Sequence, residues 1–242
     1  MDLERVFDDF CEQLNARTKF TSEDTIRYYW FTSMFKYDSL QDHYVLEEPY
    51  HEANPRLKDT TLLENKELDL LYETLTEKWA VEIKFHRKSD ATFAHTDAAG
   101  AIFADLRRLT YIPNSPDKDV KRLFLYVTDD EMHRYLVKKD NLYREKLMTF
   151  YTANPKSTIK SFEFEKNIDD TPKTFVERAN FSFDKSSIFY SPVTCLLYKK
   201  DFQISNKYFK MNNDGKTHMC YVRLYEVIDA TSTGNVDRKL EN

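Results

Sequence analysis

Glycine is scarce in this chain, with only three among 242 residues. Neither a GxGxxG nor a GxxxxGK[ST] motif is present, which argues against a glycine-rich phosphate loop and a dinucleotide-binding fold. Cysteine is equally rare: Cys11, Cys195 and Cys220 lie far apart, without CxxC or zinc-ligand spacing. An odd number of widely separated cysteines is typical of a reducing compartment, so we expect a cytoplasmic protein.

Long hydrophobic runs and an excess of positive charge are also missing. No apolar stretch approaches the length of a membrane-spanning helix, and the acidic, polar residues 1–5 are unlike a secretion signal. We therefore expect no membrane partner. The net charge of −5 argues against a high-affinity, non-specific nucleic-acid binder, because phosphate contacts dominate such binding. It does not exclude a nuclease, in which bound metal and local basic clusters supply positive charge.

What the chain does contain favours a globular domain with a sizeable core: 41% of its residues are hydrophobic and 15% aromatic. Residue periodicity and capping signals predict four helices and, within the first 130 residues, four strands. The expected helices cover 3–15, 22–34, 92–111 and 131–151, with Asn141 as a candidate break in the last, and the expected strands cover 44–50, 68–72, 79–85 and 122–127. Three strands, a helix and a fourth strand in this order suit an α/β core with a mixed sheet flanked by helices.

Charged residues interrupt two of these apolar strands, within residues 66–88. Side chains alternate across a strand, so Glu82 and Lys84 share one face. If the two strands form a hairpin, Asp69 lies beside them. Two neighbouring carboxylates repel each other unless a cation or a proton lies between them, and carboxylate oxygens suit a hard divalent cation such as Mg²⁺.

Asp69, a gap of about a dozen residues and then Glu82-Ile83-Lys84 resemble the PD-(D/E)XK nuclease superfamily. The E-x-K triplet is common by itself. It gains weight from its strand setting, from the aspartate on a preceding apolar strand, and from the helix and strand that follow. Leu68 stands in place of the family's proline, at a position that varies in the family. The alternative interpretation is a surface hairpin with a Glu–Lys cross-strand pair.

The resemblance implies an α/β (α+β) fold: a restriction-endonuclease-like mixed sheet flanked by helices, here with a β-rich C-terminal extension. It implies that Asp69 and Glu82 bind Mg²⁺, or Mn²⁺ in its place, with the backbone carbonyl of Ile83 as a third ligand. Lys84 would position the attacking water and stabilise the transition state. Glu23, on a helix ahead of the first strand, is a candidate further ligand. An equally weighted alternative is that Glu23 only offsets the helix dipole.

Other polar residues near this stretch are weaker candidates. His86, Arg87 and Lys88 follow Lys84 closely and could contact a phosphate backbone, although cationic strand ends are often only solvated. Three polar residues of the expected helix 92–111, His95, Asp97 and Asp105, could support the site, but a surface or packing role is favoured for each.

The sequence divides into three regions. Residues 1–154 are expected to form the nuclease-like core with its N-terminal helices. Residues 155–228 are rich in strand-forming residues, including an expected β-rich segment at 175–183, and belong to the same domain or to a subdomain. Their aromatic side chains could stack on bases, but a role in the core is favoured. Residues 229–242 read as a disordered polar tail.

The leading hypothesis is therefore a Mg²⁺-dependent endonuclease of restriction or defence type that hydrolyses phosphodiester bonds in double-stranded DNA. A homodimer would bring two such sites to two strands. Two alternatives stay open. One is an RNA-cleaving effector of the same fold, because recognition of the 2′-OH leaves no short motif. The other is a non-catalytic module for nucleic-acid binding or assembly.

Overall fold

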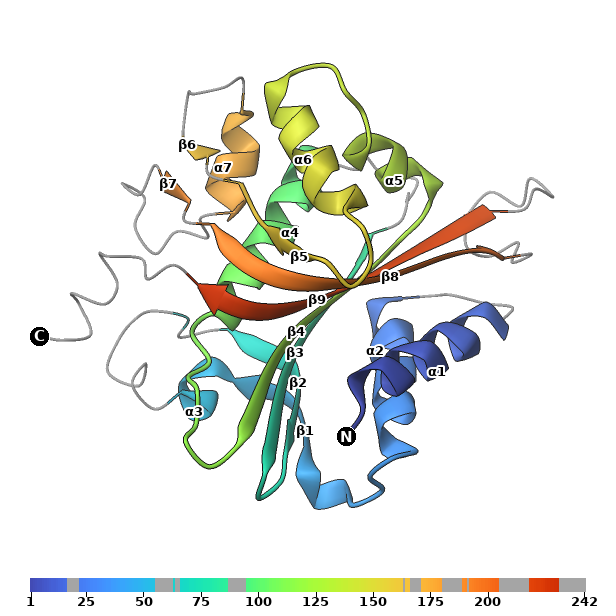
Figure 1. Ribbon diagram of the computed structural model, residues 1–242, viewed down its shortest axis with the longest axis vertical. Helices are drawn as coiled ribbons and strands as arrows, with labels where there is room; N and C mark the ends of the chain where they lie inside the picture. Colours follow the sequence, from blue (N-terminus) through green and yellow to red (C-terminus); the bar gives the residue numbers. More distant parts are fainter. Residues whose placement is uncertain are drawn as a thin grey trace, which may run out of the picture.

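A seven-stranded mixed sheet forms the centre of the protein, in the order β1-β2-β3-β4-β9-β8-β5 (Figure 1). The computed structural model describes residues 1–16, 22–54, 63, 66–86, 95–162, 164–165, 171–179, 189–190, 192–204 and 218–230. β3 and β4 run parallel, and every other neighbouring pair in this sheet is antiparallel. The strands are β1 (Tyr44–Pro49), β2 (Glu67–Glu73), β3 (Glu77–His86), β4 (Asp119–Thr128), β5 (Thr158–Lys160), β8 (Val193–Ile204) and β9 (His218–Ala230), while β6 (Phe164–Glu165) pairs separately with β7 (Phe189–Tyr190).

Helices cover both faces of the sheet (Figure 1). α1 (Leu3–Ala16) and α2 (Glu23–Phe35) lie on one face. α4 (His95–Leu109), α5 (Asp130–Leu136), α6 (Leu142–Thr152) and α7 (Lys173–Ala179) lie on the other. A 3₁₀ turn (Gln41–His43) precedes β1 and the short α3 (Tyr50–Ala53) follows it. The expected α+β class, a mixed sheet with helices, is confirmed.

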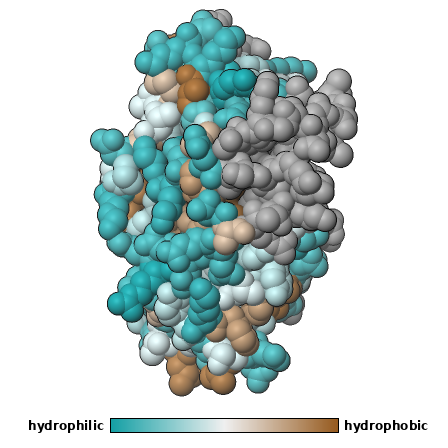
Figure 2. Space-filling model, turned by 90° about the vertical axis from the view of Figure 1, so that its right-hand side faces the viewer, coloured by the Kyte–Doolittle hydropathy of each residue, from teal (hydrophilic) through white to brown (hydrophobic). Residues whose placement is uncertain are grey.

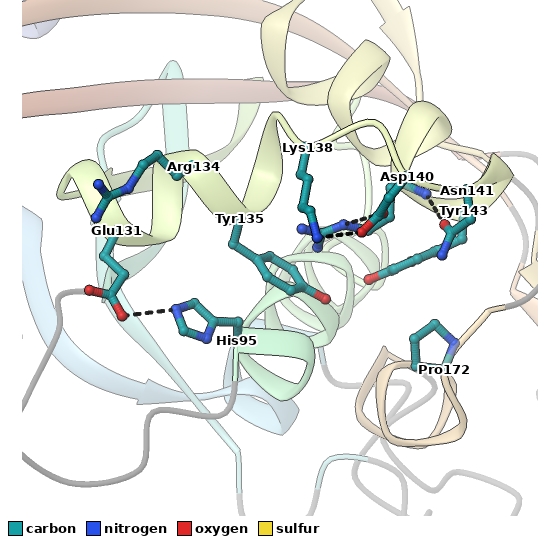
Figure 3. Close-up of a pocket in the computed structure, with 10 residues that line it drawn as sticks. His95, Glu131, Arg134, Tyr135, Lys138, Asp140, Asn141, Tyr143 and Pro172 are labelled. Atoms are coloured by element: carbon teal, nitrogen blue, oxygen red, sulfur yellow. Dashed lines mark hydrogen bonds and ion pairs between the residues drawn. The ribbon is translucent and has the colours of Figure 1, made fainter.

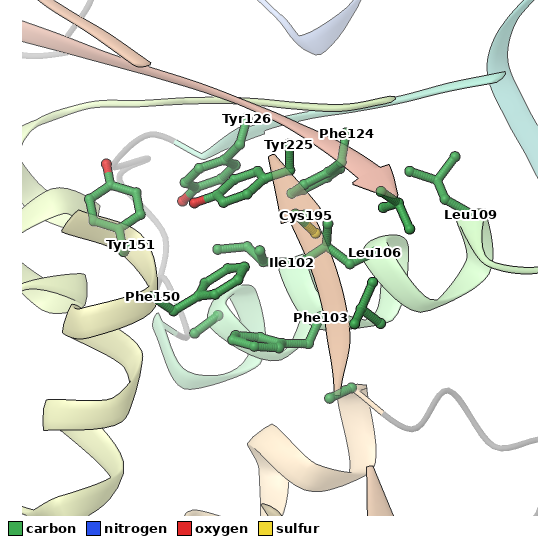
Figure 4. Close-up of a cluster of buried hydrophobic side chains, with 14 of the residues drawn as sticks. Ile102, Phe103, Leu106, Leu109, Phe124, Tyr126, Phe150, Tyr151, Cys195 and Tyr225 are labelled. Atoms are coloured by element: carbon green, nitrogen blue, oxygen red, sulfur yellow. The ribbon is translucent and has the colours of Figure 1, made fainter. Parts of the chain in front are cut away.

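Each face of the sheet contributes to a separate hydrophobic core. Alternate residues of β3 divide between them: Val81 and Ile83 face α1 and α2, whereas Ala80 faces α4. Aromatic rings fill the second core, where Phe124, Tyr126, Phe150 and Tyr225 gather against α4 (Figure 4). Because strands in the middle of the sheet are buried on both faces, β4 contains a continuous apolar run rather than an alternating pattern.

One expectation for secondary structure is confirmed and one is wrong. The helical segment expected over 131–151 is interrupted before Asn141, the expected break, because the Asn141 side chain caps α6 by accepting from the backbone N–H of Arg144 at 2.9 Å. Strand was expected over 175–183, but α7 covers the beginning of this segment. Its buried residues Phe175, Val176 and Ala179 have helical spacing and face α4 rather than a sheet.

The C-terminal boundary also differs from the expectation. Asp229 and Ala230, which were assigned to a disordered tail, are the last residues of β9 and pair with β8. Residues 231–242 lie outside the described residues.

The coloured surface in Figure 2 is mostly hydrophilic, with apolar residues in small separate groups. Among the described helices, none is both long enough and apolar enough to cross a membrane.

Candidate active site in the strand fork

The sheet divides where β2 and β3 stop pairing. Their ladder runs from the Glu73–Lys78 pair to the Leu70–Val81 pair and ends there. Beyond that point β3 stays paired with β4 as far as its last residue, while β2 stays paired with β1. Continuing the ladder by one residue would set Asp69 opposite Glu82. The two acids are therefore the first residues past the last pair, and we call the region of Asp69, Glu82, Ile83 and Lys84 the strand fork.

Asp69 joins the two sides of the strand fork. Its Oδ2 accepts the backbone N–H of Ile83 at 2.6 Å, which replaces a missing ladder bond between β2 and β3. Its Oδ1 accepts from Arg27 Nη2 of α2 at 2.5 Å. The carboxylate is thus fixed by one backbone donor and one charged donor, and such charge-assisted bonds hold a side chain in a defined orientation.

Glu82 is more deeply buried, with only 3% of its side chain exposed. Its Oε1 accepts from the Tyr50 hydroxyl at 2.6 Å and from Arg108 Nε at 3.2 Å. Burial raises the pKa of Glu82 to about 7; Arg108 opposes this shift, and the nearby carboxylates of Asp105 and Asp69 add to it. Glu82 therefore lies close to the point at which it gains or loses its charge at neutral pH.

Lys84 connects the strand fork to the first turn of α2. Its Nζ donates to Glu23 Oε1 at 3.1 Å, and the backbone N–H of Phe85 donates to Glu23 Oε2 at 3.0 Å. Burial by itself would lower the pKa of Lys84, but the carboxylates around it, first among them Asp105, outweigh burial and raise it. The ammonium group therefore stays protonated, which suits it to stabilise negative charge rather than to remove a proton from water.

Asp105 of α4 is also part of this cluster. One of its oxygens pairs with Arg108, and the other is buried without a hydrogen bond among the described residues. Burial raises the pKa of this carboxyl group. The sequence favours a surface or packing role for Asp105, but its spacing also indicates a buried position. It falls three residues after Ile102 and four before Leu109, both of which are buried, so all three share one helix face.

The structure brings together the three expected catalytic residues, and Glu23 reaches them through Lys84. His86 does not extend the cluster as a cation. Its ring contacts the Tyr126 hydroxyl at 3.2 Å, and burial lowers its pKa to about 3, so the ring is neutral at physiological pH. Arg87 and Lys88, the other expected phosphate contacts, lie outside the described residues.

Three residues that bind the acids were not expected from the sequence: Arg27, Tyr50 and Arg108. Arg27 could have been found, because it lies four residues after Glu23 and so shares a helix face with it. Arg108 could have been inferred in the same way from Asp105, three residues before it. Tyr50 gives no such signal, because it begins the short α3 and its contact with Glu82 joins residues 32 positions apart.

The donor chemistry around the strand fork fits a divalent cation in part. Carboxylate and carbonyl oxygens are the ligands that Mg²⁺ prefers, and the raised pKa of Glu82 and the unbonded oxygen of Asp105 indicate buried negative charge that is only partly compensated. Among the described residues, however, no three His, Cys, Asp or Glu side chains converge closely enough to hold an ion. Glu23 is held by Lys84 and Phe85 instead. A cation here would therefore rely on Asp69, Glu82 and a backbone carbonyl.

Comparison with protein families, curated proteins and solved structures gives no match to this chain.

Proposed function

We propose that this protein is a metal-dependent nuclease with a restriction-endonuclease-like core, and that it hydrolyses phosphodiester bonds in DNA. One observation carries the proposal: β2 and β3 separate at Asp69 and Glu82, the first residues past their last pair, with Lys84 two residues further along β3. A fork in a sheet leaves backbone groups and charged side chains unshared by the ladder. It is therefore a suitable place for polar groups that act on a ligand.

Each residue has a distinct role in this proposal. Asp69, Glu82 and the Ile83 carbonyl would hold Mg²⁺ or Mn²⁺, with Glu23 as a candidate further ligand. Such an ion would supply Lewis-acid chemistry at the phosphate. Lys84, kept protonated by the surrounding carboxylates, would stabilise the negative charge that develops on the phosphate oxygens. Arg27 and Arg108 orient the two acids and are positioning residues.

The overall negative charge of the protein is compatible with this proposal. Three basic side chains, Arg27, Lys84 and Arg108, lie around the strand fork, and each is mostly buried beside a carboxylate. Charges in such a setting are screened much less by salt than charges on the surface.

The direct test is a cleavage assay. Purified protein is incubated with plasmid DNA, linear DNA and RNA in Mg²⁺, Mn²⁺ or EDTA, beside the variants Asp69→Asn, Glu82→Gln and Lys84→Ala. We expect cleavage that needs the divalent ion and falls at least about a hundredfold in each variant, because each removes a charge used in the transition state. The preferred substrate decides between a DNA nuclease and an RNA-cleaving effector.

Glu73→Gln is the matched control. Glu73 lies on β2, as Asp69 does, and forms ion pairs with Lys118 and Lys78 at the other end of the strand. Its loss should leave cleavage unchanged. Cleavage that survives the three strand-fork substitutions would place the chemistry elsewhere and refute the proposal. Size-exclusion chromatography with light scattering on the same preparations tests the expected homodimer.

One observation favours a second candidate, a non-catalytic binding or assembly module. Asp69 and Glu82 already bond to arginines, so the cluster can serve as a set of internal ion pairs that needs no metal. This candidate predicts no cleavage of any substrate under any metal condition and no binding of Mn²⁺ by calorimetry. Metal binding that is lost in Asp69→Asn would count against it.

A further inference from the structure

A second polar site lies away from the strand fork. A hollow of about 400 Å³ opens between the N-terminal end of α4, the helix α5 and the start of α6 (Figure 3). Its lining includes the basic residues Arg134, Lys138 and Arg144 and the acidic residues Glu131 and Asp140. His95 and Asp105 are ten residues apart on α4, which corresponds to about 15 Å along the helix axis. The hollow is therefore separate from the proposed active site.

Arg144 is the residue that makes this hollow more than a surface depression. Only 6% of its side chain is exposed, and its guanidinium carbon lies 3.4 Å from the centre of the Tyr135 ring, which fixes its plane. Nε faces Asp140 Oδ1 at 3.5 Å, but Nη1 is buried without a hydrogen bond among the described residues. A buried charged donor that lacks an acceptor is costly, so this group is suited to an acceptor that arrives with a ligand.

Lys138 provides the second donor at the same end of the hollow. It is exposed and bonds Asp140 at 2.6 Å, so Asp140 faces both Lys138 and Arg144 (Figure 3). Glu131 lies toward the other end, where it pairs with His95 at 3.4 Å (Figure 3). An anion entering beside Asp140 would therefore meet two cationic side chains and compete with one carboxylate.

We infer that this end of the hollow binds a phosphate monoester, with Arg144 and Lys138 as its donors. A monoester carries a charge of about −1.5 to −2 at neutral pH and three acceptor oxygens, so it competes better than a single carboxylate for these two cations. A phosphodiester carries only one charge and would gain less. The planar guanidinium suits the geometry of phosphate oxygens. The same chemistry is found on a free nucleotide and on the 5′-phosphorylated end of a nucleic-acid strand.

The experiment is a binding titration by calorimetry, without divalent metal and with EDTA present. The probes are inorganic phosphate, AMP and a short single-stranded oligonucleotide with either a 5′-phosphate or a 5′-hydroxyl. We expect the monoester probes to bind and the 5′-hydroxyl strand not to bind. Binding of AMP but not of the phosphorylated strand would identify a nucleotide site. Binding of the phosphorylated strand but not of AMP would identify a strand-end site. Since no cleavage is measured, the result is independent of the proposed nuclease activity.

Variants test the assignment of the donors. Lys138→Gln should weaken binding about tenfold, as expected for the loss of one charge-assisted contact. Asp140→Asn should tighten it, because it removes the competing carboxylate. Lys139→Gln is the matched control, since this exposed neighbour does not line the hollow, and it should have no effect. Arg144→Gln should abolish binding. Because Arg144 is buried, circular dichroism checks that this variant still folds. If it does not, the substitutions of the two exposed residues, Lys138 and Asp140, still decide whether the inference holds. The inference is wrong if no monoester binds, or if neither Lys138→Gln nor Asp140→Asn changes the affinity.

Discussion

Glu82 shows how strongly the environment of one residue can set its chemistry. Its side chain is enclosed by Tyr50, Arg108 and the sheet, and burial raises its pKa to about 7 even though a guanidinium lies beside it. A carboxyl group with this pKa is easily converted between its charged and neutral forms near physiological pH. The proposed role as a metal ligand requires the charged form, so a bound cation and a proton would compete for Glu82.

The raised pKa of Glu82 has a consequence for stability. Between its ordinary value of 4.5 and about 7, the folded protein holds a proton that the unfolded chain has lost. The free energy of unfolding contributed by Glu82 therefore decreases as the pH rises through this window. His86 and His133 act in the opposite direction, because burial lowers their pKa values to about 3 and about 4. The contribution of Glu82 must therefore be measured as the difference in unfolding free energy between the wild type and a variant that lacks this carboxyl group.

We expect this difference to appear between the wild type and Glu82→Gln in urea unfolding from about pH 5 to about pH 8. The wild type should lose stability relative to the variant as the pH rises, with most of the change complete slightly above pH 7. The histidine contributions cancel because both proteins contain them. Two curves that run parallel throughout would show that Glu82 titrates at its ordinary value.

At the level of elements, α4 determines much of the arrangement around the proposed site. Its C-terminal half carries Asp105 and Arg108 to the strand fork, and its first residue, His95, lines the hollow beside α5. Between these ends, Gly100 lies against α7. A Cβ atom at Gly100 would lie 2.7 Å from the carbonyl oxygen of Phe175 and 2.8 Å from Cβ of Arg178. The close approach of the two helices therefore depends on the absence of a side chain at this position.

Gly100→Ala should consequently destabilise the protein. In an ordinary helix interior this substitution stabilises by about 1 kcal/mol, because alanine loses less backbone entropy than glycine. Here the added methyl group overlaps the backbone of α7, which must shift, and we expect a net loss of about 1–3 kcal/mol in the free energy of unfolding. Chemical denaturation measures it. Gly100→Ser should be at least as harmful, and a stabilising Gly100→Ala would show that α7 moves away freely.

At the level of the whole molecule, the sheet combines segments that are far apart in the chain. β9 comes from residues 218–230 and lies beside β4, in the interior of the sheet, although 89 residues separate it from the end of β4. It contributes to both cores: Val222 and Leu224 face α1 and α2, while Tyr225 and Val227 face the α4 side. β9 is therefore an internal part of the sheet that carries the strand fork rather than an addition at its edge.

A chain that ends at residue 154, which contains every strand-fork residue, should therefore fail to fold. Without β9, β4 becomes an exposed edge strand, and both cores lose part of their packing. We expect no cooperative thermal transition and rapid proteolysis, in contrast to the full chain. A cooperative transition in the shortened chain would show that residues 1–154 form a domain on their own, and would favour a separate C-terminal subdomain.

Sequence patterns predicted the N-terminal half of the fold well because its signals are local. The helix at 3–15 and the strands at 44–50, 68–72 and 79–85 follow from periodicity and strand propensity, and each appears within a few residues of its expected bounds. Strand is the wrong prediction for residues 175–179, because aromatic residues favour strands whereas in the structure packing against α4 favours a helix. Tertiary contacts override weak propensities in such short segments.

The sequence by itself determined the α+β class and indicated that Asp69, Glu82 and Lys84 share a neighbourhood, since strand alternation and the short connection between β2 and β3 act over few residues. Only the tertiary structure decided which groups hold these side chains. Arg27, Tyr50, Asp105 and Arg108 come from three helices, and their convergence depends on how those helices pack on the sheet. The same is true of the place of β9 beside β4, because pairing between strands far apart in the chain leaves no local signal in either strand.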